Sequence, residues 1–397
     1  MAILGDYIRI KHGFAFKGDY ITTEDNGVVL VTPGNFEIGG GFKEKKCKFF
    51  SAEYPVDYVL HAGDLIVTMT DLSKQGDTLG FSALVPNSNR TYLHNQRIGL
   101  VDVFNPEADK DYIYWFMRTP YYQKTIVATA SGSTVKHTSP LRICDVKIEL
   151  PPLDEQKKIS SILRSIDDKI ENNQKINDNL EQQAQSYFQE LFVNNADPEW
   201  TTGTISDLGT IVGGSTPSKA KPEYYTESGI AWITPKDLSI NKSKFISHGE
   251  NDITELGLKN SSAAIMPEGT VLFSSRAPIG YIAIAAGEVT TNQGFKSVVP
   301  KPEIGTPFVY FFLKHNLQVI EGMASGSTFK EVSGSTMKNI PAVIPDVDTL
   351  ARFNDFCTSI FAQQRVLEEQ SHSLAVLRDN LLSKLMSGEI DVSDIQL

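Results

Sequence analysis

The stretch A-S-G-S-T at Ala130 to Thr134 occurs again at Ala324 to Thr328, 194 residues later (324 − 130). A proline follows each copy at the same distance, as Leu150-Pro151 and as Ile344-Pro345. The match extends backward through both halves, pairing Val31 to Pro33 with Ile233 to Pro235, Gly63 to Thr68 with Gly269 to Ser274, and Asn95-Gln96 with Asn292-Gln293. A repeat of this length indicates two copies of a whole domain and not a solenoid.

A heptad pattern follows each copy of the repeat. After Pro151, residues recur every seven positions in two interleaved series, which are Ile159, Ile166, Asn173, Leu180 and Tyr187, and then Leu163, Ile170, Asn177, Ala184 and Leu191. This is the a/d seam of a long helix. After Pro345 the first series recurs as Phe353, Ile360, Leu367, Leu374 and Leu381, while the second is more polar, as Cys357, Gln364, Ser371, Arg378 and Leu385. The second helix therefore needs a partner with a richer seam, and the first helix is the obvious one.

The sequence thus predicts an α/β (α+β) fold with two similar globular domains in a pseudo-two-fold arrangement, separated by a long antiparallel two-helix coiled coil. The expected parts are a first domain over 1–150, a central helix over 151–195, a second domain over 196–345 and a distal helix over 346–397. Asp154 is the expected N-cap of the first helix, and Gly388 is expected to close the second. Antiparallel pairing places Asn173 and Asn177 near Gln364, Leu367 and Ser371.

Composition agrees with two domains. The chain has 397 residues, 41% of them hydrophobic and 21% charged, which is enough for two cores and both helices. It shows neither a transmembrane-length apolar run nor a cleavable signal, so we expect a soluble, cytoplasmic protein. The cysteines Cys47, Cys144 and Cys357 have no metal-ligand spacing and are expected to be reduced thiols.

The net charge of −11 argues against nucleic acid only at first sight. Residues 1–150 hold 16 basic and 17 acidic side chains, and residues 196–345 hold 12 and 14, so both domains are near neutral. The excess of acid lies in the two helical segments. A local basic face on each domain is therefore compatible with this composition.

The order of two similar domains and two heptad helices resembles the specificity subunit of type I restriction-modification systems. Short sequence motifs also resemble those of this family. They are L-P-P-L-D-E-Q-K-K-I from Leu150 to Ile159, the two A-S-G-S-T stretches, Ser274 to Gly280 and Thr291 to Gly294. The resemblance covers essentially the whole chain. One departure is Pro345 to Leu350, which lacks the Glu-Gln found at Glu155-Gln156.

The resemblance implies a non-catalytic scaffold that reads DNA. Two target recognition domains would read the halves of a bipartite site in double-stranded DNA. Two modification (methyltransferase) subunits would bind the scaffold, restriction subunits would join through the complex, and the chain itself would hold no cofactor or metal. The expected docking surface is the start of the first helix, at Glu155, Gln156, Lys157 and Lys158.

One loop differs in length between the halves. Thr68 to Gly80 is six residues longer than its counterpart, since the offset falls from 206 (269 − 63) to 200 (280 − 80). Unlike half-sites need such a difference, although a solvated hairpin tip is the alternative. The candidate base-reading residues are Thr70, Asp71, Lys74 and Gln75 in the first half and Ser274, Ser275 and Arg276 in the second. Arg276 is the strongest of them, because an arginine fork can grip guanine; an exposed arginine or one paired with a carboxylate is the alternative.

Residues shared by both halves cannot explain two different half-sites. Asn95, Gln96, Arg97, Asn292 and Gln293 are therefore expected to hold the DNA backbone or to brace a turn. The repeated glycine loops supply hydroxyls and lysines suited to phosphate, at Ser133, Thr134, Lys136 and His137 and at Ser327, Thr328 and Lys330. Further basic candidates are Lys43, Lys45, Lys46, Lys219, Lys221 and Lys236, with a solvated strand face as the alternative.

Catalytic motifs are missing from the sequence. It has no phosphate-binding glycine loop, no zinc-protease motif and no nucleophile elbow, and Asn105-Pro106-Glu107 stops short of an amino-methyltransferase motif. A self-sufficient methyltransferase or nuclease is therefore disfavoured. The alternative from another class is a coiled-coil adaptor that binds protein and not DNA.

Overall fold

The computed structural model describes residues 2–71, 73, 75–326 and 330–395. The chain divides into two compact units. Unit 1 combines residues 1–169 with 373–397, and unit 2 is residues 170–372. Helix α4 (Leu153–Gln189) and helix α11 (Val347–Met386) each contribute one segment to each unit.

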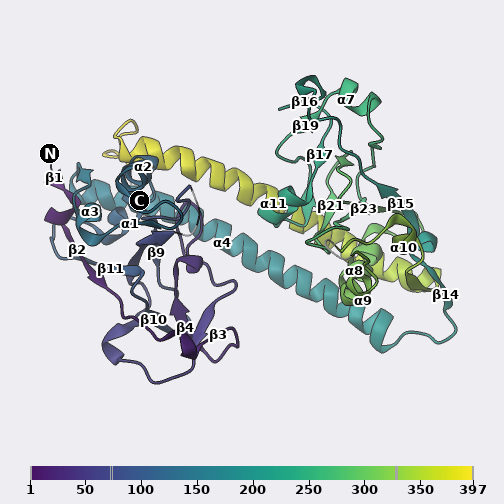
Figure 1. The fold of residues 1–397 in the computed structure, drawn as a ribbon, viewed down its shortest axis with the longest axis horizontal. Helices are drawn as coiled ribbons and strands as arrows, with labels where there is room; N and C mark the ends of the chain where they lie inside the picture. Colours follow the sequence, from purple (N-terminus) through teal and green to yellow (C-terminus); the bar gives the residue numbers. More distant parts are fainter. Residues whose placement is uncertain (1, 72, 74, 327–329, 396–397) are drawn as a thin grey trace. The chain divides into compact units, whose positions relative to one another are not determined.

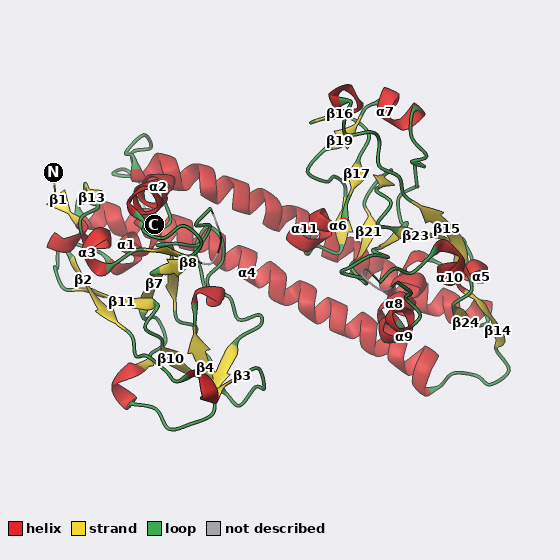
Figure 2. Ribbon diagram, in the orientation of Figure 1, coloured by secondary structure: helices red, strands yellow, loops and turns green. Residues whose placement is uncertain are grey.

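Unit 1 carries two larger sheets (Figures 1 and 2), with strand orders β3-β5-β4-β10-β6 and β2-β11-β7-β9. The pairs β1-β13 and β12-β8 are separate small sheets. The strands are β1 Ala2–Ile3, β2 Ile8–His12, β3 Ile21–Thr22, β4 Val28–Val31, β5 Lys48–Phe50, β6 Val59–Leu60, β7 Leu65–Thr68, β8 Thr70–Asp71, β9 Ser82–Leu84, β10 Thr91–His94, β11 Ile98–Val103, β12 Lys136–His137 and β13 Lys147–Ile148. The short helices are α1 Lys110–Phe116, α2 Pro120–Thr129 and α3 Pro140–Cys144.

Unit 2 is built around one larger sheet, with strand order β15-β23-β20-β21-β18, and the small pairs β14-β24, β16-β19 and β17-β22. Its strands are β14 Thr201–Thr204, β15 Gly209–Gly213, β16 Tyr225–Thr226, β17 Trp232–Ile233, β18 Phe245–Ile246, β19 Asp252–Ile253, β20 Val271–Phe273, β21 Ile282–Ala285, β22 Thr290–Thr291, β23 Lys296–Pro300 and β24 Pro341–Ile344. Its short helices are α5 Ile205–Leu208, α6 Pro235–Ile240, α7 Glu255–Lys259, α8 Thr306–His315, α9 Leu317–Gly322 and α10 Gly334–Lys338.

The two units share one sheet topology. The order β2-β11-β7-β9 in unit 1 corresponds to β15-β23-β20-β21 in unit 2. The central strands β7 and β20 are buried on both faces, because alternate side chains enter different cores. Leu65 packs with helix α1 whereas Ile66 packs with β4, and in unit 2 Val271 packs with α8 whereas Leu272 enters the second core. The predicted domain repeat is therefore confirmed at the level of strand order, while the four-part division of the chain stays a prediction.

The long helices follow the predicted seam. All seam positions of both helices are buried or half-buried. Gly388 has φ +72° just past α11, as expected of a residue that ends a helix. The prediction for Asp154 was wrong, because α4 already begins at Leu153 and Asp154 lies in its first turn, where a carboxylate still faces the positive end of the helix dipole.

Within each unit the two helix segments run antiparallel. In unit 1, Lys158 donates to the carbonyl of Ser393 at 2.6 Å and Asp167 pairs with Arg378 at 2.7 Å. In unit 2, the Asn173 side chain donates to Ser371 at 3.2 Å, and Gln364 donates to the backbone carbonyl of Asn177 at 3.1 Å. The predicted neighbourhood of Asn173 and Asn177 is confirmed.

These two asparagines lead to a prediction about stability. Their Oδ1 atoms are buried and accept no hydrogen bond from the described residues. Replacing both, Asn173→Leu with Asn177→Leu, is expected to raise the free energy of unfolding by about 1–3 kcal/mol, because an unpaired buried polar atom costs about that much. Asn173→Leu also removes the side-chain hydrogen bonds of 2.9 and 3.2 Å to Gln370 and Ser371, which favour one register, so slipped or intermolecular pairing should appear.

Thermal unfolding and light scattering measure the two effects of this double substitution. Asn172→Leu, at an exposed position of the same helix, is the matched control. A double variant that stays monomeric with an unchanged unfolding midpoint would contradict the expectation.

A buried cation joins each globular part to its helices. In unit 1, Arg118 contacts Asp167 of α4 at 3.0 Å and donates to the carbonyl of Gly39 at 2.8 Å. In unit 2, Lys244 pairs with Glu181 of α4, which also pairs with Lys314 at 2.6 Å. Burial alone would raise the pKa of Glu181, but Lys244 and Lys314 together lower it, so the carboxyl stays charged.

Candidate nucleic-acid interface

The repeated glycine loops are closed in the same way in both units. In unit 1, Ser131 and His137 exchange two backbone hydrogen bonds of 2.9 and 2.8 Å. In unit 2, Ser325 and Glu331 exchange bonds of 3.0 and 2.9 Å at the matching positions. Gly132 has φ +95°, a conformation that favours glycine. The two ends of each loop are therefore joined by backbone hydrogen bonds.

The side chains of the loop in unit 1 are largely accessible. Ser133, Thr134 and His137 are exposed and Lys136 is half-buried. In unit 2, Lys330 is exposed, while Ser327 and Thr328 lie outside the described residues. The prediction that these loops contact DNA stays a prediction, and the exposed hydroxyls and lysines are compatible with phosphate contacts.

The longer loop of unit 1 folds onto Asp71. The buried Asp71 carboxylate accepts hydrogen bonds from the backbone N–H groups of Ser73 and Thr78, at 2.6 and 2.5 Å, and from the Thr78 hydroxyl at 2.8 Å. Burial would raise the pKa of Asp71, but these hydrogen bonds outweigh it and lower the pKa. Thr70 is also buried, Gln75 is exposed, and Lys74 lies outside the described residues. Asp71 therefore braces the loop that presents Gln75.

The shorter counterpart in unit 2 places its candidates differently. Ser274 and Ser275 are fully buried, and their hydroxyls donate to the carbonyls of Pro278 and Gly294 at 2.9 and 3.1 Å. Arg276 is about half-exposed, with its Nε atom 3.0 Å from Oε2 of Glu331. The two serines brace the turn in this conformation, and Arg276 is the side chain of the three that reaches the surface.

The shared Asn-Gln pairs form matching turns. The Asn95 side chain accepts a hydrogen bond from the N–H of Arg97 at 3.0 Å, and Asn292 accepts one from Gly294 at 2.9 Å. A Cβ on Gly13 would collide with the Asn95 carbonyl oxygen, and one on Gly214 would collide with that of Asn292. Both asparagines thus brace their turns, and the expected contact with the DNA backbone stays a prediction. Gln96, Arg97 and Gln293 are exposed beside them, with Gln293 accepting from Thr216.

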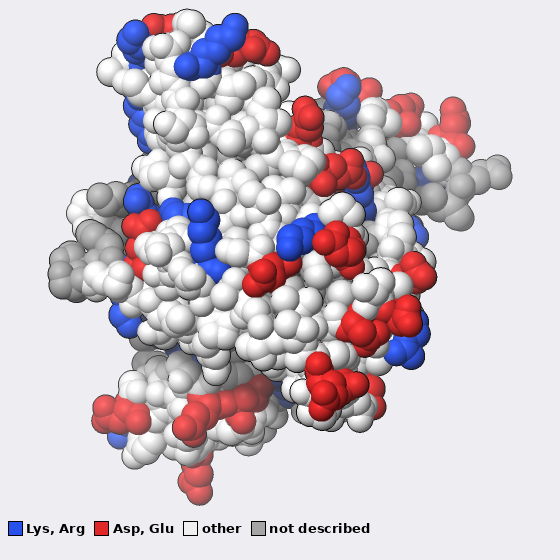
Figure 3. Space-filling model, turned by 90° about the vertical axis from the view of Figure 1, so that its right-hand side faces the viewer, with Lys and Arg blue, Asp and Glu red and all other residues white. Residues whose placement is uncertain are grey.

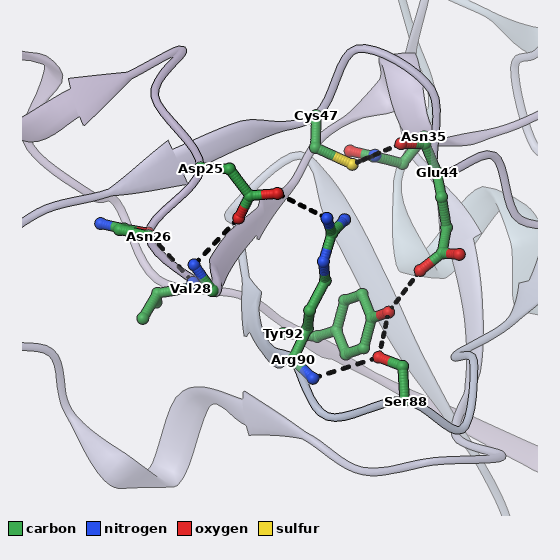
Figure 4. A network of polar contacts seen from close by, with 10 residues as sticks. Asp25, Asn26, Val28, Asn35, Glu44, Cys47, Ser88, Arg90 and Tyr92 are labelled. Carbon is green, nitrogen blue, oxygen red and sulfur yellow. Dashed lines mark hydrogen bonds and ion pairs between the residues drawn. The ribbon is translucent and has the colours of Figure 1, made fainter. Parts of the chain in front are cut away.

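A polar network holds the lysine-rich segment of unit 1 (Figure 4). The Cys47 thiol lies 3.4 Å from the Asn35 amide and donates to the Glu44 carbonyl at 3.1 Å, while the Tyr92 hydroxyl donates to the Glu44 carboxylate at 2.7 Å. Burial raises the pKa of Cys47, which keeps the thiol protonated. The segment is thus anchored from inside. Its basic side chains point outward, since Lys45 and Lys46 are exposed and half-buried Lys43 lies 3.6 Å from Glu37.

In unit 2 several candidates gather around one cleft of about 370 Å³. Its lining includes Thr216, Lys219, Lys236, Asn292 and Gln293 together with the acidic Asp237 and Glu250. Lys236 pairs with Glu250 at 2.5 Å, and Lys221 lies 5.3 Å from the centre of the Tyr224 ring. On the face shown in Figure 3, the Lys and Arg side chains of the described residues are scattered among Asp and Glu. Positive charge is therefore local on that face.

Sequence reasoning missed Glu331. It faces Arg276 and also lies 3.5 Å from Lys296. The offset of 194 could have identified it (331 − 137), because it matches His137 in the first half.

The predicted docking surface also needs a correction. Gln156 is buried and bonds to Asp109 and Glu107 at 2.8 Å, so that surface keeps Lys157 together with the partly exposed Glu155 and Lys158.

The described residues hold neither a cluster of metal ligands nor a membrane-spanning helix. No group of three or more His, Cys, Asp or Glu side chains there is arranged to hold a metal ion. None of the helices in that part of the chain is both long and apolar enough to cross a membrane.

Comparisons with known proteins agree on one family. The model for "Type I restriction modification DNA specificity domain" matches residues 3–182 and 198–367. The Type I restriction enzyme MjaIX specificity subunit of Methanocaldococcus jannaschii is 38% identical over 191 residues, which cover 46% of this chain and 44% of that protein. The HindI specificity subunit of Haemophilus influenzae is 24% identical over 347 residues, which cover 68% of this chain and 75% of that protein. The MjaIX match thus spans less than half of that relative.

A solved structure has the same fold. The crystal structure of a Type-I restriction-modification system S subunit from M. genitalium matches with a TM-score of 0.59 at 18% sequence identity, covering 96% of this chain and 94% of that one.

Proposed function

Because the chain belongs to the type I restriction modification DNA specificity family, we propose that it selects a bipartite site in double-stranded DNA for partner enzymes. The observation that carries this proposal is the duplicated scaffold with unlike side chains. The same closed loop stands on the same sheet order in both units, yet Thr70 and His137 face each other in one and Arg276 and Glu331 in the other. Two domains with the same fold but different side chains at equivalent positions can recognise two different half-sites.

The proposed DNA contacts are the accessible candidates. Exposed or half-exposed polar side chains can reach bases or phosphates, and these are Lys43, Lys45, Lys46, Gln75, Gln96, Arg97, Ser133, Thr134, Lys136, His137, Lys219, Lys221, Lys236, Arg276, Gln293 and Lys330. The buried or turn-forming candidates, which are Thr70, Asp71, Asn95, Ser274, Ser275 and Asn292, are proposed to shape the loops that present them. Base contacts would set the sequence and phosphate contacts the register.

The proposed role is non-catalytic and is carried out in the cytoplasm. Methyl transfer and cleavage would be the work of modification and restriction subunits assembled on this chain. The family match supports this role over a protein-binding adaptor.

The test of the proposed function is selection from random DNA. The chain, reconstituted with its modification subunits, is incubated with a random duplex pool at several salt concentrations, and the bound fraction is sequenced. We expect enrichment of a split motif that survives at salt levels where non-specific binding is lost. Binding without any enriched motif would overturn the proposal.

The repeat also predicts the stoichiometry of assembly. One chain should bind two modification subunits, because the duplication offers the same surface twice. Leu350 in unit 2 is equivalent to Gln156 in unit 1, and both side chains are buried. The different sequence at Pro345 to Leu350 therefore does not change the burial at this position. Native mass spectrometry at saturating subunit concentration measures the ratio. A complex that stops at one modification subunit would contradict this expectation.

A further inference from the structure

Backbone hydrogen bonds define which residues of the two units are equivalent. In unit 1, the N–H of Met69 donates to Arg97 at 2.9 Å, and that of Thr138 donates to Met69 at 3.0 Å. In unit 2, Ser275 makes the same two contacts, with Gly294 at 2.7 Å and with Val332 at 2.9 Å. The residues that follow, Thr70 and Arg276, therefore stand at the same place on the scaffold.

The partners of these two residues are equivalent as well. Thr70 pairs across β8 and β12 with His137, and Arg276 forms a bridge with Glu331. The side-chain chemistry differs, however. In unit 1 the Thr70 hydroxyl and the His137 Nδ1 atom form a hydrogen bond of 3.1 Å, while unit 2 has a guanidinium beside a carboxylate.

The carboxylate of Glu331 approaches one edge of Arg276. Oε2 lies 3.0 Å from the Nε atom, and Oε1 lies 3.5 Å from Lys296. None of the described residues accepts a hydrogen bond from the two terminal nitrogens, Nη1 and Nη2 of Arg276. Those nitrogens form the end of the fork that can donate to O6 and N7 of guanine together.

Stability does not account for this ion pair. The side chains of Arg276 and Glu331 are 47% and 32% exposed, and ion pairs on a protein surface contribute little to folding. Holding a long, flexible arginine in one orientation does reduce the entropy that it loses on binding a base.

We propose, resting on the proposed function, that Glu331 is a positioning residue that aims Arg276 at a guanine of the second half-site. At the equivalent place in unit 1, His137 offers one ring nitrogen beyond the one that contacts Thr70. A single donor cannot grip a guanine with two hydrogen bonds. The paired position 70/137 and 276/331 therefore determines one base pair in each half-site and makes the two half-sites different.

The first test of this inference is Glu331→Gln in the reconstituted complex, read by sequencing the sites that it selects. Glutamine keeps the size of the side chain but removes the charge that holds the guanidinium. Discrimination at one base pair of the second half-site should fall about tenfold, while the first half-site and the thermal unfolding midpoint stay unchanged. Glu321→Gln, at an exposed position of α9, is the control and should select the wild-type motif.

The second test transfers the unit 1 pair into unit 2 by Arg276→Thr with Glu331→His. Loss of a bidentate contact is expected to reduce discrimination at the same base pair by about 5- to 150-fold, equivalent to about 1–3 kcal/mol. If both variants select the wild-type motif at every position, the inference fails while the proposed function stands. If the wild-type complex itself selects no split motif, the proposed function fails first.

Discussion

Replacing Lys244 by alanine is expected to lower the free energy of unfolding of unit 2 by about 3–5 kcal/mol, the usual result of removing one partner of a buried ion pair. The Lys244 ammonium is buried between α4 and α11, where it pairs with Glu181 and donates to the Gln364 side chain at 2.5 Å. It also lies 4.0 Å from the centre of the Phe361 ring, which attracts a cation. Without it, the largely buried carboxylate of Glu181 keeps Lys314 at 2.6 Å and the Tyr310 hydroxyl, which donates to it at 3.3 Å, but loses one of its two cations.

Chemical denaturation of Lys244→Ala measures this loss. Lys259→Ala, at an exposed position of α7, is the control and should change stability by no more than about 0.5 kcal/mol. The double replacement Lys244→Met with Glu181→Leu removes both charges and fills similar volume, so it should recover most of the lost stability. A loss below about 1 kcal/mol in Lys244→Ala would show that the network is hydrated in solution.

Arg276→Ala is expected to weaken recognition of the second half-site by about 1–3 kcal/mol and to leave the first half-site intact. The side chain is half-exposed, so its truncation should leave the fold unchanged. Gln75→Ala, on the loop braced by Asp71, is the reciprocal substitution and should affect the first half-site alone. Methylation sequencing of the reconstituted complexes identifies the altered half. Loss of both half-sites from either substitution would contradict independent reading by the two domains.

The duplication and the helices could be predicted because they depend on spacing along the chain. The 194-residue offset correctly identified the loops closed at Ser131 and Ser325, and the heptad series identified the buried faces of α4 and α11. The pseudo-symmetry of the two heptad series also correctly predicted that Asn173 lies beside Ser371. Periodic patterns of this kind are local, and long helices repeat them many times.

The candidate interface was predicted only as a region. Arg276 and Gln75 are accessible as expected, but Ser274, Ser275 and Asp71 are buried. Asp71 and Ser274 are hydrogen-bonded within their own turns, to Thr78 and Pro278, whereas Ser275 donates to Gly294 in another turn. Polar residue type predicts exposure on average, and a polar side chain is buried wherever such partners are available.

The sequence by itself determined that this chain holds two copies of one domain and two long helices, since repeats and heptads are written in residue spacing. The tertiary structure decided which polar side chains of those domains are buried and which are exposed on the surface. Lys244 and Arg118 look like surface cations in the sequence, yet both are buried against the carboxylates of α4. Those contacts join residues far apart along the chain, so their energy depends on the folded arrangement and not on any local pattern.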